Sequence, residues 1–459
     1  MPGLLLSVSF DDIDSRFWGC TTHLAGLFLV EASHLPRVRL ADYPLLVRLN
    51  PAIPWKTRGN AAVVARLWVD GEDAAWDTCG LAESLAWEYT APRVGEPEKQ
   101  PGVACVLGRP WESRVARALY SRALTDVVTV DEALRVAWRI GARVAGGRGR
   151  IGAVSALAAL APGDPYTYEL TAYRHPSMWG ERRCVDHEAA AKVEAAVPPC
   201  VFNNYDPQRG RLTAAPGGPD PVLAGFRGTC PEWLGAYSTV LCEEPHFWVL
   251  YRSNQHTDAH ARPLGPPRPY KTGVAKAVVE SDPRVAAGGH VFVRARLEGG
   301  ASVELAFYKE TGPLNRAARL LRAGDSITVL ANVRPYSPHG IPLLTVEKML
   351  VQRVAASRIR ASPRCPRCGH RMKRTGRGGH YKCPRCGYKA PLSPLVIPEP
   401  RLMGPGVYTP GEGRLRHLTA PPWLSIPILE SLEGPEWGMA TSTSANPPVQ
   451  HPPASTGAH

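Results

Sequence analysis

Three carboxylates stand close together near the start of the sequence, at Asp11, Asp12 and Asp14. They follow an apolar stretch, residues 4–10, that predicts a short buried strand. Carboxylates this close repel one another unless a cation is present, and Mg²⁺ prefers a few carboxylates together with phosphate oxygens. The cluster therefore suggests a magnesium and nucleotide site. Spacing alone leaves a second interpretation equally open, in which one aspartate caps a helix and the others are solvated.

Two threonines, Thr21 and Thr22, stand where the next helix is expected to begin. Backbone N–H groups at a helix start attract phosphate, and a threonine hydroxyl can act as a ligand or a nucleophile. Ordinary N-capping is the commoner role for such a residue, and the residues alone favour that interpretation.

A glycine-rich loop, Gly147-x-Gly149-x-x-Gly152, matches the letters of the dinucleotide-binding fingerprint. The fingerprint needs a strand before the loop, whereas residues 130–145 predict a helix, so we reject NAD binding. A glycine loop that carries arginines and precedes a helix is still suited to holding phosphate. Because the sequence has no Gly-Lys-Ser/Thr P-loop, a nucleotide site here must be unconventional.

Two further polar clusters follow predicted strands, at residues 55–60 and 252–258. Loops at strand ends often carry functional residues, which makes both clusters candidates for a site. By composition alone, however, such clusters are more often surface turns.

Four of the eleven cysteines form the pattern Cys365-x2-Cys368-x14-Cys383-x2-Cys386. Each Cys-x-x-Cys turn supplies two thiolates, and four thiolates satisfy tetrahedral Zn²⁺, so the pattern predicts a structural zinc site. A redox role is the poorer alternative, because nothing nearby resembles a thioredoxin unit. The other seven cysteines are scattered and odd in number, which argues against a disulfide framework in a chain without a leader.

The basic charge of the chain is concentrated around these four cysteines. The formal net charge is +13, and residues 348–398 contain thirteen Lys or Arg and no Asp or Glu. Such a patch suggests a polyanion, most commonly nucleic acid, although a solvated basic face is the other interpretation. The residues expected to contact RNA are Arg364, Arg367, Lys373, Arg374, Arg377, Lys382 and Arg385.

The 459 residues predict several domains rather than one core. After a proline-rich linker at residues 261–268, three predicted strands, a short helix and two strands follow between residues 272 and 351. This is the order of an OB-fold, a small barrel that often binds oligonucleotides. No apolar run reaches the roughly 20 residues of a membrane span, and the N-terminus does not resemble a signal peptide. We therefore expect a cytoplasmic protein that does not contact membranes.

Several longer strings of residues resemble the archaeal isoleucine-tRNA 2-agmatinylcytidine synthetase family. They lie at residues 8–15, 19–22, 47–51, 53–61, 147–149, 151–153, 220–223 and 251–258. The resemblance covers roughly residues 4–420, and the OB-like region and the zinc ribbon come last, as in that family. The chain departs from the family at Ile13, where threonine is usual. That side chain alternates away from Asp12 and Asp14 on a strand, so the metal ligands are retained.

The resemblance implies a multidomain α+β fold. Its expected parts are a kinase-like α/β domain at residues 1–60 with about 146–260, a ferredoxin-like domain at 61–145, an OB-fold β-barrel at 267–356 and a zinc ribbon at 360–392. A C-terminal segment at 393–438 and a disordered tail at 439–459 are expected to follow.

The resemblance also implies an ATP-dependent ligase. It would couple agmatine to the 2-carbon of the wobble cytidine of tRNA(Ile) with a CAU anticodon, forming 2-agmatinylcytidine (agmatidine). ATP would be consumed to AMP, the 2-oxygen of the cytidine phosphorylated, and that phosphate displaced by agmatine. Asp11, Asp12 and Asp14 match the family's Mg²⁺ and ATP ligands, and Thr21 matches the threonine that becomes phosphorylated. Further phosphate-binding residues are expected at Thr22, Lys56, Arg58, Arg148, Gly149 and Arg150.

Two alternatives remain open from the sequence. One is a non-catalytic nucleic-acid-binding protein built on the OB-fold and the zinc ribbon, which leaves about 250 N-terminal residues without a role. The other is the same chemistry with another amine or tRNA. The residues of the agmatine pocket stay unassigned. Because the basic excess and the aspartates lie at opposite ends of the chain, we expect deletion of residues 357–459 to weaken tRNA binding and spare the ATP site.

Overall fold

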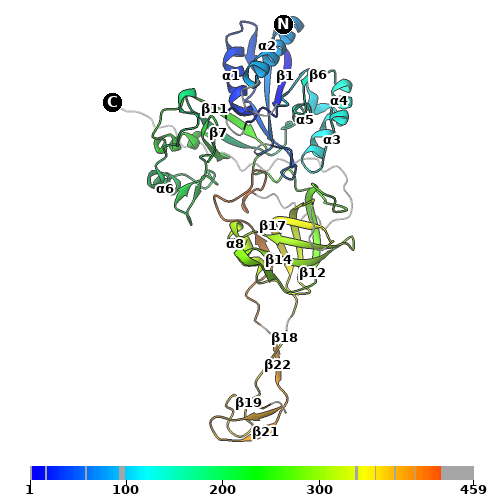
Figure 1. The fold of residues 1–459 in the computed structure, drawn as a ribbon, viewed down its shortest axis with the longest axis vertical. Coiled ribbons are helices and arrows are strands. Elements are labelled where there is room, and N and C mark those ends of the chain that lie inside the picture. The colour runs from blue at the N-terminus through cyan, green and yellow to red at the C-terminus, as the bar shows by residue number, and fades with distance from the viewer. Residues whose placement is uncertain are drawn as a thin grey trace, which may run out of the picture.

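A nine-stranded sheet organises the N-terminal half of the computed structural model (Figure 1). The structure describes residues 3–15, 18–56, 59–91, 99–335, 340–356, 358–376, 379–398 and 400–424. The strands of this sheet are β1 (Leu4–Asp11), β2 (Val38–Leu40), β3 (Leu45–Arg48), β4 (Ala61–Val69), β5 (Gly102–Leu107), β6 (Arg143–Gly146), β7 (Thr167–Tyr173), β10 (Val222–Gly228) and β11 (Phe247–Ser253). They pair in the order β10-β7-β11-β3-β4-β1-β5-β6, with β2 beside β4.

Helices cover both faces of this sheet, so its central strands are apolar almost throughout. The helices are α1 (Thr21–Ser33), α2 (Glu72–Thr90), α3 (Arg114–Ala123), α4 (Val130–Arg139) and α5 (Arg150–Ala156), with a short turn η1 (Pro110–Glu112) before α3. On β1, Val8 and Phe10 pack in one core with α1 and α2. Ser7 and Ser9 alternate to the opposite face, where α5 contacts the strand.

The strands β4 and β5 flank β1 on either side through antiparallel pairing. Residues 61–145 therefore lie in the same sheet as residues 1–60. The division of this region into a kinase-like and a ferredoxin-like domain stays a prediction.

The other end of the sheet carries a second core. Its elements are η2 (Pro176–Met178), α6 (His187–Ala196), the hairpin β8 (Tyr205–Asp206) and β9 (Arg211–Leu212), α7 (Pro231–Leu234) and η3 (Gly235–Val240). Phe226 of β10 stacks on Tyr237 with ring centroids 4.8 Å apart, at the centre of this core.

A small closed barrel follows. It contains β12 (Thr272–Val279), β13 (Arg284–Val285), η4 (Ala287–Gly289), β14 (Val291–Leu297), β15 (Ser302–Phe307), η5 (Lys309–Thr311), α8 (Pro313–Ala318), β16 (Ser326–Val333), β17 (Leu343–Arg353) and β23 (Gly406–Tyr408). The strand β12 pairs with both β14 and β16, which closes the sheet on itself. The predicted order of three main strands, a helix and two strands is confirmed.

A narrow stalk leads from the barrel to the cysteine-rich end. The stalk is an antiparallel pair of β18 (Arg358–Ala361) and β22 (Leu395–Pro398), and beyond it lie β19 (Lys373–Thr375), β20 (His380–Lys382) and β21 (Lys389–Pro391). This end projects away from the N-terminal sheet (Figure 1). After β22 the chain returns to the barrel, where β23 pairs with β17.

One predicted helix is too long. Residues 130–145 were expected to be helical throughout, but α4 ends at Arg139 and residues 143–146 form β6, which pairs with β5. Pairing with a neighbouring strand thus overrides the local helical pattern. A strand does precede the glycine loop, so the reason given for rejecting a dinucleotide site was wrong.

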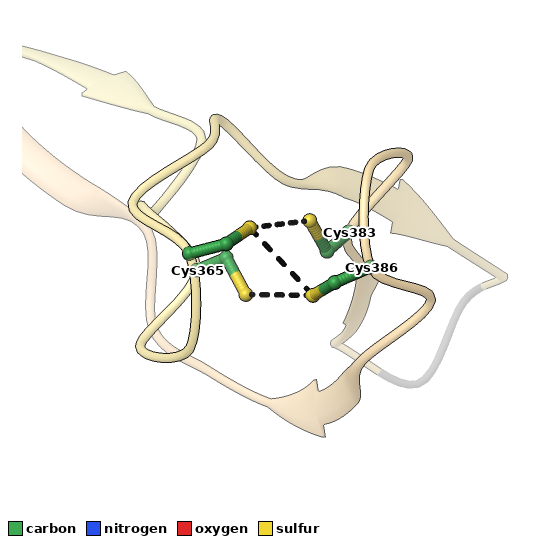
Figure 2. A group of neighbouring side chains, drawn as sticks. Cys365, Cys383 and Cys386 are labelled. Carbon is green, nitrogen blue, oxygen red and sulfur yellow. Dashed lines mark hydrogen bonds between the residues drawn. The ribbon is translucent and has the colours of Figure 1, made fainter.

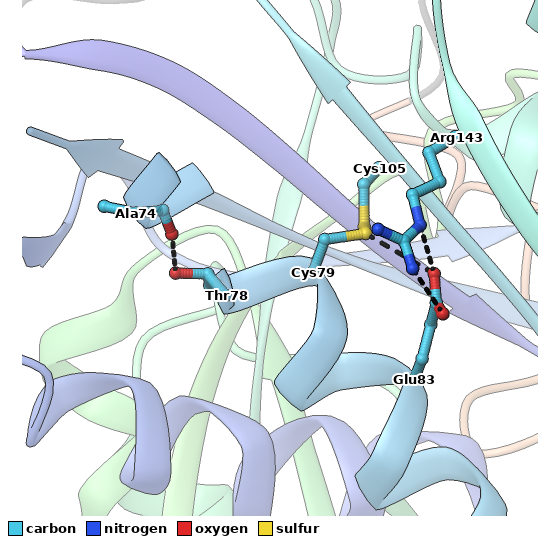
Figure 3. The surroundings of a disulfide bond; sticks show 6 residues. All are labelled: Ala74, Thr78, Cys79, Glu83, Cys105 and Arg143. Carbon is cyan, nitrogen blue, oxygen red and sulfur yellow. Dashed lines mark hydrogen bonds and ion pairs between the residues drawn. A yellow bond between two sulfur atoms is a disulfide. The ribbon is translucent and has the colours of Figure 1, made fainter. Parts of the chain in front are cut away.

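The expectation against disulfides was also wrong. Six of the seven scattered cysteines form the pairs Cys79–Cys105, Cys184–Cys242 and Cys200–Cys230. The first joins α2 to β5 beside the ion pair of Arg143 with Glu83 (Figure 3). The partners are 26, 58 and 30 residues apart in sequence, so only the tertiary fold brings them together. Among the described residues, no helix has the length and apolar character needed to cross a membrane.

Candidate active site

The end of β1 brings the three aspartates to one cavity. Asp11 is the last residue of β1, and Asp12 follows with a φ of 57°, a left-handed conformation that is uncommon outside glycine. Such backbone conformations cost free energy and cluster at functional sites. The cavity is open to solvent, and the empty space in and in front of it amounts to about 730 Å³. Its lining includes Asp11, Asp12, Asp14, Leu49, Ile53, Trp55, Lys56, Asn60, Asp126, Val127, Val128, Arg148 and Gly152.

Glycines allow α5 to begin directly against the aspartates. A Cβ at Gly152 would lie 1.9 Å from Asp11 Oδ2, and a Cβ at Gly149 would lie 2.5 Å from the Asp11 carbonyl oxygen. Across the same contact, a Cβ at Gly102 would lie 2.0 Å from the carbonyl carbon of Gly149. The glycine pattern seen in the sequence therefore serves close packing of this loop on the end of β1.

Arg148 is the positive partner of one carboxylate in the cluster, Asp12. Arg148 donates from Nη2 to Asp12 Oδ2 at 2.7 Å and from Nε to the same oxygen at 3.1 Å. Burial, and then the neighbouring Asp12, raise the pKa of Asp11 well above its usual value. Burial also raises the pKa of Asp12, against the lowering effect of Arg148. A cation bound here would relieve this repulsion, and carboxylate oxygens are the ligands that Mg²⁺ accepts.

Thr21 does not cap the helix that it begins. The N-cap of α1 is Cys20 and makes no side-chain capping bond, whereas Thr21 is the first residue of the helix. The Thr21 hydroxyl accepts from the Ile13 backbone N–H at 3.3 Å and donates to Asp14 Oδ2 at 3.1 Å. The expectation of a hydroxyl N-cap is therefore wrong, and the hydroxyl is instead tied to the aspartate segment. Thr21 is buried and contacts Asp14 without lining the cavity itself.

Of the other predicted phosphate-binding residues, some line the cavity and some do not. Arg148 and Lys56 line the cavity, although the Lys56 ammonium donates to the carbonyl oxygens of Pro51 and Ile53 at 2.6 and 2.7 Å. Arg150 donates to the carbonyl oxygen of Gly147 at 2.9 Å. Gly149 is buried against Asp11. The Thr22 hydroxyl lies 3.3 Å from Cys20 Sγ, and Arg58 is outside the described residues.

Sequence reasoning missed Arg48, which ends β3 beside this site. Its Nε donates to Gln255 Oε1 at 2.7 Å, and its guanidinium lies 3.8 Å from Glu169. Burial lowers the pKa of Arg48, while the carboxylates of Glu169 and Asp14 raise it. Arg48 lies next to the cavity, because the residue that follows it, Leu49, and its strand partner, Ala61, both line that cavity. Its sequence signals were its place at the end of a predicted strand and within residues 47–51, one of the strings that resemble the family.

The four ribbon cysteines meet as their spacing predicts. The sulfur of Cys368 lies 3.4 Å from that of Cys383 and 3.6 Å from that of Cys386, and all four sulfurs lie within 4.8 Å of one another (Figure 2). Within the described part of the chain, the three aspartates form no such close group of ligand atoms. Four converging thiolates suit a tetrahedral Zn²⁺.

The basic residues of the ribbon face solvent. Six of the seven predicted RNA contacts are exposed: Arg364, Arg367, Lys373, Arg374, Lys382 and Arg385. Arg377 lies outside the described residues. Lys348, at the start of the basic stretch, is different, because it is fully buried and paired with Asp258.

Comparisons with known proteins place these features in one family. A family model of the TiaS TCKD domain matches residues 7–74, one of the TiaS FLD domain matches residues 147–260, and one of the TiaS C-terminal zinc ribbon domain matches residues 362–401. The isoleucine-tRNA 2-agmatinylcytidine synthetase TiaS of Acidilobus saccharovorans is 49% identical over 432 residues, covering 94% of this chain and 97% of the relative. The protein of the same name from Staphylothermus marinus is 37% identical, covering 92% and 94%.

Solved structures agree with the sequence relatives. A crystal structure of the complex of TiaS with its isoleucine tRNA and ATP has a TM-score of 0.79 and 29% identity, covering 91% of this chain and 97% of that one. A complex of TiaS with the same tRNA, AMPCPP and agmatine has a TM-score of 0.75 and 27% identity, covering 91% and 96%. The chain is a multidomain α+β protein with a zinc ribbon domain, and it belongs to the isoleucine-tRNA 2-agmatinylcytidine synthetase (TiaS) family.

Proposed function

We propose that this protein is an ATP-dependent ligase that couples agmatine to the wobble cytidine of the isoleucine tRNA with a CAU anticodon, forming agmatidine. The observation that carries the proposal is near full-length identity of 49% to a 2-agmatinylcytidine synthetase, together with the aspartate-lined cavity at the end of β1. Its substrates and partners are this tRNA, ATP and agmatine, the kinds of molecule held in the complexes of related proteins. A cytoplasmic location remains a prediction.

The chemistry needs activation of a poor leaving group. In the proposed reaction, the 2-oxygen of the cytidine attacks phosphorus of an ATP phosphoryl group, and an O–P bond forms as a phosphoanhydride bond breaks. The primary amine of agmatine then attacks the 2-carbon, and the C–O bond breaks so that phosphate leaves with the former 2-oxygen. Positioned cations stabilise the charge of the transferring phosphoryl group. The base must leave its stack to reach the cavity.

Asp11, Asp12 and Asp14 are the proposed ligands of Mg²⁺ and ATP. Their burial and mutual repulsion support this role, since a dication would offset both. Because Mg²⁺ is usually held by one or two carboxylates and completed by phosphate oxygens, the aspartates need not surround the ion by themselves. The other proposed phosphate contacts include Arg148 and Lys56, which line the same cavity.

A substitution of Asp12 tests this assignment. Asp12→Ala should abolish ATP turnover, because it removes a proposed Mg²⁺ ligand. The fold should persist, because the ion pair that the substitution breaks is with the half-exposed Arg148. Asp70→Ala is a matched control, since it removes an exposed aspartate paired with Arg39 at 3.6 Å. Near-normal ATP turnover by a folded Asp12→Ala protein would leave the aspartates with a purely structural role.

Thr21 is the proposed phosphate acceptor within the protein. Its hydroxyl already donates to Asp14 Oδ2, so this carboxylate is placed to take the proton when the oxygen attacks phosphorus. Thr21→Ser should keep some agmatine incorporation, whereas Thr21→Asn and Thr21→Val should fold and lose it. Phosphopeptide mapping after incubation with γ-labelled ATP gives a second measurement. An active Thr21→Val protein would show that transfer of a phosphoryl group from ATP to the cytidine does not need phosphorylation of Thr21.

The finer domain assignments belong to the same proposal. We assign a kinase-like catalytic domain and a ferredoxin-like domain to the N-terminal sheet region, and an OB-fold to the barrel. Zn²⁺ bound by Cys365, Cys368, Cys383 and Cys386 would hold the ribbon in shape, as converging thiolates require. The exposed arginines and lysines of the ribbon would contact RNA phosphates, and the barrel would add stacking or backbone contacts.

One experiment separates this function from its alternatives. The protein is incubated with the isoleucine tRNA, ATP and either agmatine or another amine, and the wobble nucleoside is analysed by mass spectrometry. A mass increase that requires both ATP and agmatine supports the proposal. Incorporation of a different amine in preference would change the substrate, and tRNA binding without any product would leave a non-catalytic RNA-binding protein.

A further inference from the structure

The chain that follows the zinc ribbon returns to the N-terminal sheet. After β23, residues 414–420, here called the strap, run across the junction between the barrel and the sheet region. Leu418 of the strap is 2% exposed and belongs to the core beneath α3, α4 and α5. The matches of the family models end at residue 401, so none of them describes the strap.

The strap is anchored first to the segment before β8 and to β8 itself. Arg414 Nε donates to Asp206 Oδ2 at 3.0 Å, and both side chains are largely buried. The Leu415 backbone N–H donates to Asn203 Oδ1 at 3.2 Å. Asn203 has a φ of 60°, so the backbone there is held in a conformation that most residues avoid.

The strap next pairs with residues 253–258, which follow β11. The backbone N–H groups of His256 and Asp258 donate to the carbonyl oxygens of His417 and Leu418 at 2.7 and 2.9 Å. The side chain of His256 donates from Nδ1 to the Thr419 carbonyl oxygen at 2.9 Å. Burial lowers the pKa of His256 to about 3, so this imidazole is neutral and Nδ1 carries the proton. Six of the seven residues of the polar cluster 252–258 are buried and Arg252 is half-buried, so the interpretation of this cluster as a surface turn was wrong.

The third anchor lies in the barrel. Thr419 donates its hydroxyl to Glu347 Oε2 at 2.8 Å, and Arg416 lies 3.2 Å from Glu347 Oε1. Glu347 is 1% exposed and also pairs with His260 at 3.0 Å. The strap therefore contacts the barrel and the sheet region at one buried polar junction.

The same junction holds Arg48 next to the cavity that the aspartates line. Asn254 accepts from the Arg48 backbone N–H at 2.7 Å and donates to the Arg48 carbonyl oxygen at 2.9 Å. Gln255 accepts from the Arg48 side chain at 2.7 Å. On the strap side, a Cβ built at Gly59 would lie 2.6 Å from Arg48 Nη1 and 3.0 Å from His417 Nε2, so the guanidinium and the imidazole lie close together. Arg48 holds the pKa of His417 well below its usual value. Arg48 thus lies between the strap and the cavity, which its neighbours Leu49 and Ala61 line.

We propose that the strap is a positioning element of the catalytic site, which fixes Arg48 through residues 253–258 and ties the site to the barrel that engages the tRNA. This inference rests on the proposed function, because it assigns the strap a part in agmatine transfer. The strap is required for the reaction and dispensable for tRNA affinity, since the basic residues of the ribbon are elsewhere. Cutting the chain at residue 357, the deletion suggested by charge alone, would remove the strap as well and damage the ATP site.

The test uses the full chain with paired substitutions. The strap variant combines Arg414→Ala with Thr419→Ala, which removes one anchor to Asp206 and one to Glu347. Arg209→Ala is the matched control, because Arg209 lies 3.7 Å from the same Asp206 oxygen but is outside the strap and is half exposed. The measurements are kcat for agmatine incorporation at saturating tRNA, the Kd for tRNA, and the thermal unfolding midpoint.

We expect the strap variant to lose at least about tenfold in kcat while its Kd for tRNA changes less than about twofold. Arg209→Ala should match the unaltered protein in both. A cycle with Arg48→Ala distinguishes positioning from loss of stability. If the strap acts through Arg48, the strap substitutions should lower kcat little further in that background, whereas independent effects would multiply.

Four outcomes decide between the ideas. Full kcat in the strap variant overturns the inference, and so does a loss of about tenfold that multiplies with Arg48→Ala. A Kd for tRNA that rises well beyond about twofold in the strap variant also overturns it, because the strap would then serve binding. No agmatine incorporation by the unaltered protein would instead refute the proposed function.

Discussion

Gly152→Ala is the sharpest single test of how the fold shapes the proposed site. The added Cβ would lie 1.9 Å from Asp11 Oδ2 and 2.5 Å from Asp11 Cγ, whereas real Cβ contacts stay beyond 3.0 Å. The carboxylate oxygen must therefore retreat from 1.9 Å to at least 3.0 Å from the new methyl group. Because Asp11 is short and α5 packs against β1, rotation of this side chain is the easiest response.

The expected effects on stability and activity differ in size. Overpacking at a buried contact costs about 1–3 kcal/mol of unfolding free energy. A displacement of roughly 1 Å at a reacting centre costs about 10²-fold in rate. Gly152→Ala should therefore remain folded at moderate temperature and lose about 10²-fold in kcat/KM for agmatine incorporation. Gly149→Ala should be less stable, because its Cβ would meet backbone atoms that cannot rotate away.

The assay compares Gly152→Ala with Gly80→Ala. Gly80 lies inside α2 with no heavy atom within 4 Å of its would-be Cβ. Alanine there should add about 0.8–1 kcal/mol of stability through helix propensity and leave activity unchanged. Thermal unfolding and agmatine incorporation are measured on all variants. Wild-type kcat/KM in a folded Gly152→Ala protein would refute the argument that the Asp11 carboxylate must occupy its present position.

Four further predictions concern charge, metal, RNA binding and disulfides. The pKa of Asp11 is raised in the fold, so ionised Asp11 lowers the free energy of unfolding at neutral pH but not below the pKa of the unfolded state. Asp11→Asn should therefore raise the unfolding midpoint at about pH 7, lose that advantage at about pH 3, and abolish activity. An unchanged midpoint at neutral pH would contradict this. Elemental analysis should find about one Zn per chain, as a four-thiolate site requires, and a folded zinc-free protein would remove the metal assignment. A variant in which a two-residue turn between the paired stalk strands replaces residues 362–394 should bind tRNA more weakly and with a smaller salt dependence, while ATP binding persists. Unchanged tRNA affinity at physiological salt would exclude the ribbon as an RNA contact. Reduction of the three disulfides should lower the unfolding midpoint. In the chain-entropy picture, closing loops of 26, 58 and 30 residues stabilises a fold by about 3.5–4 kcal/mol each. An equal midpoint with and without reductant would argue against these pairs.

Local sequence determined those features that depend on neighbours along the chain. The zinc cluster is such a case, because each pair of thiolates comes from one tight turn and the spacing fixes the chemistry. The barrel strands were also predictable, since each is short, apolar and bounded by turns, and their order was right. The aspartates at the end of β1 could be named from spacing and resemblance alone.

Only the tertiary structure decided which distant groups meet. The three disulfides join partners far apart in sequence, and scattered cysteines carry no local signal of pairing. Residues 143–146 became a strand because β5 offered an edge, which outweighed a helical pattern. The polar residues 253–258 became buried because distant segments supply their hydrogen-bond partners: the strap bonds to His256 and Asp258, and Arg48 bonds to Asn254 and Gln255. Burial of polar groups is tolerated only when such partners arrive, and no local pattern records that they will.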